Sequence, residues 1–173
     1  DVSKTYVFVA NHSSMFDIPA LQKSLPVNTS MVYKEELNKV PLFGWQLKFG
    51  PYIYIDRKNP DKAMKSIERA KKLMSKKKIS VVLFAEGTRS KDDTVQPFKR
   101  GAFYLATRVN HPIVPVSISG TNKIMSKGKL KINPGTITVT YDKPIDTTNI
   151  KSKVDELALM EKVREIVIQN KEV

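Results

Sequence analysis

The fold of this chain is constrained most by a short apolar run that ends in a polar loop. Residues 6–10 are rich in β-branched and aromatic side chains, a pattern typical of a buried strand. The polar residues that follow, up to Asp17, are typical of a turn into a helix. His12 therefore lies just beyond the end of an expected strand. In open α/β sheets, ligands bind beyond the carboxyl ends of the strands.

His12 and Asp17 are near enough in sequence for a tight loop to bring the carboxylate to the imidazole. A carboxylate bonded to one ring nitrogen fixes the tautomer and leaves the other nitrogen free to accept a proton. The pair is therefore a candidate general base. Asp17 also precedes an expected helix with Pro19 in its first turn, where an acidic residue is a suitable N-cap. The local sequence supports both interpretations of Asp17.

A second polar loop follows residues 79–84, the clearest buried-strand pattern in the chain. If this strand and the first are parallel neighbours, Glu86 and Arg89 share a sheet edge with His12. Gly87 permits a backbone turn that other residues resist, and Arg89 offers a planar fork of donors suited to phosphate. The alternative is a surface turn in which Arg89 pairs with Glu86.

The remaining chain alternates between strand and helix patterns. Lys34 stands at the carboxyl end of one expected strand. We expect further strands over 31–34, 52–55 and 113–118, a hairpin formed by 129–132 and 136–141, and helices over 17–24, from Pro60 to about residue 76, from residue 100, and from about Ser152. Residues 35–50 predict a broken helix. With no repeat or linker in the sequence, residues 1–173 are expected to form a single domain.

Composition narrows the class of partner. The 173 residues carry a formal net charge of +13, which favours an anionic partner such as nucleic acid, anionic lipid or a phosphorylated substrate. The absence of cysteine excludes disulfides, thiolate metal sites and a cysteine nucleophile. We see no run long enough to span a bilayer and no secretory signal. The first expected strand begins close to Asp1, which leaves open a membrane-anchoring segment upstream of the sequence.

Four blocks of sequence, in order, resemble the glycerophospholipid acyltransferases, most closely the bacterial 1-acylglycerol-3-phosphate acyltransferases. The blocks are the His-x4-Asp pattern at 12–17, the segment 50–57, the Phe-Ala-Glu-Gly-Thr-Arg-Ser segment at 84–90, and the segment 113–116. The third block has Ala85 where the family usually has proline. This departure is expected to alter the stiffness of the loop more than its chemistry.

The resemblance implies a fold and a reaction. The implied fold is α/β, a mixed central sheet flanked by helices, as in glycerol-3-phosphate acyltransferase. The implied reaction transfers a fatty acyl group from acyl-CoA or acyl carrier protein to the sn-2 hydroxyl of lysophosphatidic acid, without a metal or cofactor. The catalytic residues carried over are His12 and Asp17, and the acceptor-binding residues are Lys34, Arg57, Glu86, Gly87, Thr88 and Arg89. Backbone N–H groups after His12 are candidate donors to the oxyanion.

The implied partners are lysophosphatidic acid, the acyl donor and an anionic membrane surface, which places the protein at the cytoplasmic face of the cell membrane. A basic row on the helix after Pro60 is expected to be a solvated face that also attracts an anionic bilayer. Most of the apolar cluster around Trp45 is expected to belong to the core, with a membrane-surface contact as the alternative. Two alternatives remain open, an acyltransferase with another acceptor and a non-enzymatic lipid or acyl-carrier binding module. Nucleic acid is not expected, because charge is its only signal, and the sequence contains no Gly-x-Ser-x-Gly elbow of a serine hydrolase.

Overall fold

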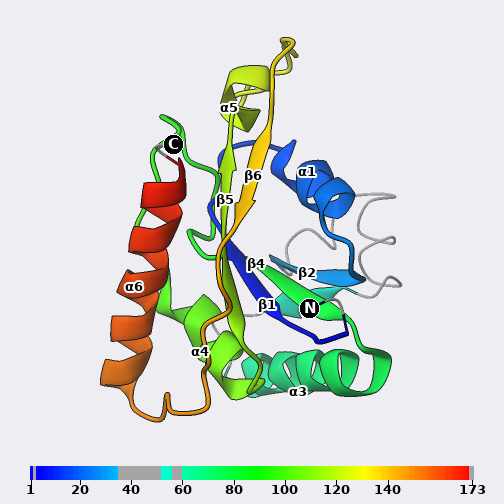
Figure 1. The fold of residues 1–173 in the computed structure, drawn as a ribbon, viewed down its shortest axis with the longest axis vertical. Coiled ribbons are helices and arrows are strands. Elements are labelled where there is room, and N and C mark those ends of the chain that lie inside the picture. Colours follow the sequence, from blue (N-terminus) through cyan, green and yellow to red (C-terminus); the bar gives the residue numbers. More distant parts are fainter. Residues whose placement is uncertain (2, 35–51, 56–59, 172–173) are drawn as a thin grey trace.

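The computed structural model describes residues 1, 3–34, 52–55 and 60–171. The strands in these residues form one six-stranded sheet in the order β3-β2-β4-β1-β5-β6 (Figure 1). Every neighbouring pair is parallel except β5 and β6, which are antiparallel. This arrangement confirms the predicted mixed sheet. The strands are β1 (Val7–Ala10), β2 (Thr29–Lys34), β3 (Ile53–Ile55), β4 (Ser80–Phe84), β5 (Ile113–Ser119) and β6 (Thr138–Tyr141).

Helices cover both faces of the sheet, as expected for an α/β protein. The helices are α1 (Asp17–Ser24), α3 (Pro60–Lys77), α4 (Arg100–Arg108), α5 (Thr121–Ile124) and α6 (Lys153–Lys171). Helices α3, α4 and α6 contribute to one buried apolar cluster, whereas α1 contributes Leu21 to a second cluster. In Figure 1, α1 lies on the opposite side of the sheet from α6.

The alternation along β1 shows how the sequence builds these two layers. Val7 and Val9 belong to the cluster with α3, α4 and α6, whereas Phe8 and Ala10 belong to the cluster with α1. Successive side chains of a strand point to opposite faces, so a central strand covered on both sides must be apolar throughout. All four residues of β1 are buried.

Of two further predictions about local structure, one is wrong in part and the other falls on residues that the structure does not describe. The predicted hairpin forms only in part, because Thr138–Tyr141 pairs with β5 whereas residues 129–132 are exposed and form no strand. The alternation of lysine with leucine and isoleucine resembles a strand, but none of the strands in the described residues pairs with it. The predicted broken helix at 35–50 lies outside the described residues.

No helix within the described residues is both long enough and apolar enough to cross a bilayer.

Candidate functional site

The two polar loops meet at one edge of the sheet. Strands β1 and β4 are parallel neighbours, with Ala10 opposite Phe84 at their carboxyl ends. Beyond the strands, the backbone N–H of Ala85 donates to the carbonyl of Ala10 at 3.2 Å, and that of Ser90 donates to the carbonyl of His12 at 2.7 Å. The expectation that the loops after β1 and β4 share an edge is therefore confirmed.

His12 and Asp17 form a direct pair. Nδ1 of His12 lies 2.7 Å from Oδ2 of Asp17. The Asp17 side chain is fully buried, whereas the His12 side chain keeps 15% of its surface exposed. The imidazole stacks on the ring of Phe84, the last residue of β4, with 4.0 Å between the ring centroids. No described residue hydrogen-bonds to Nε2 of His12, so this nitrogen is available to a substrate.

Asp17 organises the loop that carries His12. Its Oδ2 accepts the backbone N–H groups of Ser13 at 2.7 Å and Ser14 at 2.9 Å, and its Oδ1 accepts the hydroxyl of Thr121 at 2.5 Å. Helix α1 has Phe16 as its N-cap residue and no side-chain capping bond. The N-cap interpretation of Asp17 is therefore wrong, because its carboxylate faces back into the loop rather than along the helix.

These contacts also bear on the proposed oxyanion donors. The N–H groups of Ser13 and Ser14 both donate to Asp17. They are therefore already engaged, and the suggestion that the loop directly after His12 supplies the oxyanion donors is not supported at these two positions.

Glu86 lies beneath the His12 loop rather than on the surface. The residue is 2% exposed, and its Oε1 accepts the backbone N–H of His12 at 2.9 Å. Burial raises the pKa of Glu86 to about 7, although the bond from His12 opposes this shift. No ion pair joins Glu86 to Arg89 among the described residues. The alternative of a simple surface turn closed by this ion pair therefore does not hold.

The turn after Glu86 is held from a distant part of the chain. Gly87 has a φ of 69°, the left-handed region that glycine adopts without steric cost. The ammonium group of Lys127 donates to the hydroxyl of Thr88 at 3.1 Å and to the carbonyl of Arg89 at 2.6 Å. The Arg89 side chain is partly exposed and makes no ion pair with a described carboxylate.

The structure describes less of the other two predicted acceptor-binding residues. Lys34 ends β2, which is parallel to β4, with Met31 opposite Val82. The pairing with β4 ends there, and Lys34 itself pairs with Ile55 of β3. Arg57 falls outside the described residues. Thr121 and Lys127 were missed by the sequence analysis, because each reaches the site from a segment more than thirty residues away from the motif it contacts.

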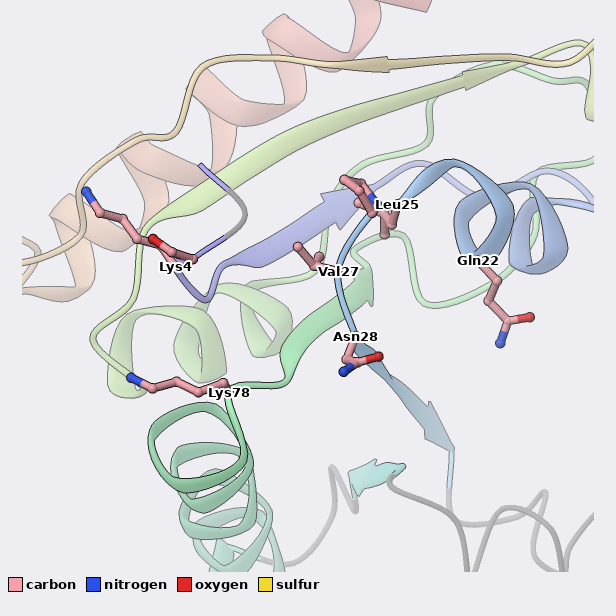
Figure 2. Close-up of a pocket in the computed structure, with 8 residues that line it drawn as sticks. Lys4, Gln22, Leu25, Val27, Asn28 and Lys78 are labelled. Carbon is pink, nitrogen blue, oxygen red and sulfur yellow. The ribbon is translucent and has the colours of Figure 1, made fainter.

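An open hollow of about 530 Å³ lies elsewhere in the molecule (Figure 2). Figure 2 shows residues that line it from the segments leading into β1, β2 and β4, at the amino ends of these strands. The labelled residues are Lys4, Gln22, Leu25, Val27, Asn28 and Lys78. His12 lies beyond the carboxyl end of β1, so this hollow is not the place where the predicted site residues meet.

Comparison with protein families and known proteins shows which family the chain resembles. A family model described as Acyltransferase matches residues 2–119. A 1-acyl-sn-glycerol-3-phosphate acyltransferase of Limnanthes douglasii is 34% identical over 96% of this chain and 59% of its own length. The protein of the same name from Salmonella typhimurium is 34% identical over 88% of this chain and 62% of its own length.

A solved structure is similar over nearly the whole chain. The 1-acyl-sn-glycerophosphate acyltransferase of Thermotoga maritima matches with a TM-score of 0.78 and 28% sequence identity, covering 96% of this chain and 65% of that one. The chain thus spans about three fifths of the length of these similar proteins.

Proposed function

Since this chain belongs to the acyltransferase family, we propose that it transfers a fatty acyl group from a thioester to the sn-2 hydroxyl of 1-acylglycerol-3-phosphate, giving phosphatidic acid. The acyl donor is acyl-CoA or acyl carrier protein. The observation that carries the proposal is the pairing of His12 with Asp17, at 2.7 Å, beside the loop that bears Arg89. Relatives named for this reaction, from a plant and a bacterium, support the choice of acceptor.

The proposed chemistry is general-base catalysis by His12. An alcohol is a weak nucleophile toward a thioester unless its proton is removed as it attacks. Nε2 of His12 takes the hydroxyl proton while the oxygen adds to the thioester carbonyl. The carbon–sulfur bond then breaks, and the proton passes from the imidazolium to the departing thiolate. No covalent acyl-enzyme is required, and the chain's own residues need no metal ion for these steps.

Asp17 is proposed to keep His12 ready for this step. Its carboxylate bonds Nδ1, so the proton on that nitrogen is fixed and Nε2 is left as the acceptor. A negative charge next to the ring also stabilises the imidazolium that forms. The three other donors to Asp17 hold the carboxylate in place whether or not His12 carries a second proton.

The acceptor's phosphate is proposed to bind near the turn after β4. Arg89 supplies a guanidinium suited to phosphate, and Lys34 and Arg57 are proposed as further cationic contacts. Gly87 allows the chain to turn, and the hydroxyl of Thr88 accepts a hydrogen bond from Lys127. Glu86 accepts the backbone N–H of His12 and so links this turn to the His12 loop. Holding the phosphate positions the sn-2 hydroxyl against His12, which is the main task once the leaving group is a good one.

The test is a panel of acyl acceptors and donors with release of free thiol as the measurement. We expect thiol release from acyl-CoA or acyl carrier protein to depend on lysophosphatidic acid and to persist in a chelator. Release that requires glycerol-3-phosphate or another lysophospholipid would reassign the acceptor. Tight binding of acyl donor without thiol release from any pair would contradict the proposal and favour a non-enzymatic binding module.

A further inference from the structure

The segment between α5 and β6 carries two strongly exposed apolar side chains, Leu130 and Ile132. Figure 1 shows this segment projecting beyond the end of the sheet next to α5. Leu130 is 95% exposed and Ile132 is 62% exposed, and both alternate with the exposed residues Lys129 and Lys131. We refer to residues 129–132 as the tip. Exposed apolar side chains that are grouped at a projecting point are typical of a site that binds a protein or a membrane.

The charge around the tip has one sign. Residues 121–135 contain four lysines and no aspartate or glutamate. Lys123, Lys129 and Lys131 are exposed to solvent. The partner of the tip must therefore accept apolar side chains and carry negative charge close by.

The tip stands on a fixed base. The backbone N–H of Asn133 donates to the carbonyl of Ile124 at 2.9 Å, which ties the two arms of the segment together. Gly120, with a φ of +85°, lets the arms approach, because a Cβ there would lie 2.1 Å from the carbonyl oxygen of Thr136. The exposed apolar side chains are thus presented by a tied loop rather than by a free end.

Helix α5 and the residues just after it contact both loops of the candidate site. Thr121 bonds Asp17 at 2.5 Å, and the carbonyl of Met125 accepts the hydroxyl of Ser14 at 2.7 Å. Lys127 bonds the carbonyl of Arg89 at 2.6 Å. Whatever binds the tip is therefore held in a fixed relation to His12.

We propose that the tip inserts into the surface of an anionic lipid bilayer and so sets the candidate site against the membrane that holds the acceptor. The proposal rests on the proposed function, because it takes the acceptor to be a lipid. A projecting point with two apolar side chains offers much less than the roughly 800 Å² that each partner buries in a stable protein interface. Lipid accepts isolated apolar side chains, and anionic headgroups attract the flanking lysines.

The experiment measures co-sedimentation of the 173-residue chain with vesicles of phosphatidylcholine and phosphatidylglycerol. The test variant is L130S/I132S, and the matched control is V154S, which removes a 74% exposed apolar side chain from α6. We expect the double variant to partition onto vesicles at least about tenfold more weakly than the unchanged chain. We expect V154S to bind as the unchanged chain does. Equal binding by all three proteins, or equal weakening in V154S, would overturn the proposal.

A second measurement separates this proposal from the proposed function. Thiol release is compared with lysophosphatidic acid in vesicles and with a short-chain acceptor dispersed as monomers. The proposal predicts that L130S/I132S loses activity only with the vesicle acceptor, and an equal loss with both acceptors would contradict it. Tip-dependent vesicle binding without thiol release from any acceptor would support docking and contradict the acyltransferase activity. If L130S/I132S lost binding to acyl carrier protein but bound vesicles as the unchanged chain does, the partner of the tip would be a protein, and the lipid assignment would be wrong.

Discussion

Asp17 and Glu156 are both buried carboxylates, but they are satisfied in different ways. Among the described residues, Asp17, in the site, accepts hydrogen bonds from two backbone N–H groups and one hydroxyl, and the ionisable side chain bonded to it is His12. Glu156, on α6, accepts Arg100 at 3.0 Å and faces Arg108 at 3.7 Å. The comparison shows one carboxylate held by neutral donors, which leaves its histidine free to exchange protons, and another held by permanent cations.

One buried carboxylate therefore maintains the fold, and the other serves the proposed chemistry. An arginine does not release its proton in a protein, so the Glu156 cluster is fixed in charge and joins α6 to α4. The neutral donors around Asp17 hold the carboxylate even if the imidazole is removed. We therefore expect activity and stability to respond to different residues.

Substituting His12→Ala should produce the largest effect, on turnover. Loss of the general base should lower kcat for thiol release by about 10²–10⁴-fold. The free energy of unfolding should change by only about 1 kcal/mol, because Asp17 keeps its other three donors. Steady-state kinetics and thermal unfolding are the two measurements. A large fall in melting temperature would show that His12 is a structural residue.

The double substitution R100Q/R108Q should lower folding stability and leave turnover nearly unchanged. Each arginine side chain is 45% exposed, but removing both leaves the buried carboxylate of Glu156 without a cation. Stranding a buried charge costs roughly 3 kcal/mol of folding stability. Urea unfolding should detect this loss, while kcat at a temperature where the variant is folded should remain close to that of the unchanged chain. A fall in kcat comparable to that of His12→Ala would erase the contrast between the two regions.

Glu86→Gln should change how stability depends on pH. Burial raises the pKa of Glu86 from 4.5 to about 7, so the folded state holds the proton more tightly than the unfolded chain. Stability from this group is complete below pH 4.5 and is lost as the pH rises to about 7, by roughly 3 kcal/mol.

The glutamine variant keeps an oxygen to accept the His12 N–H but does not titrate. The difference in unfolding free energy between pH 5 and about pH 8 should therefore be smaller in the variant. Unfolding in urea at both pH values provides the measurement. An unchanged difference would mean that Glu86 titrates alike in the folded and unfolded chain.

Much of the sheet could be predicted from the sequence, because buried strands demand uninterrupted apolar runs. The predicted strands at 79–84 and 113–118 match β4 and β5 to within a residue. The predicted strand at 129–132 failed because alternation records spacing and not the presence of a neighbouring strand. Helix α5 has four residues, too few for a helical period to show in the sequence.

The contact between His12 and Asp17 could be predicted from the sequence, but the residues that hold this pair in place could not. His12 and Asp17 carry a recognisable spacing, and the meeting of their loop with that of Arg89 follows once the strands are parallel neighbours. Whether Asp17 would cap α1 or turn back to His12 depends on the backbone of the loop, which the sequence does not fix. Thr121 and Lys127 lie on a remote segment, so no local pattern could assign them to the site.

A double-mutant cycle on kcat with His12→Ala and Asp17→Asn measures whether the two side chains act as one unit. If Asp17 contributes to catalysis only through the imidazole of His12, replacing it in the His12→Ala variant should lower kcat no further. The account predicts that the double variant is as slow as His12→Ala alone. Losses that multiply in the double variant would show that the two residues act independently, and would contradict the account.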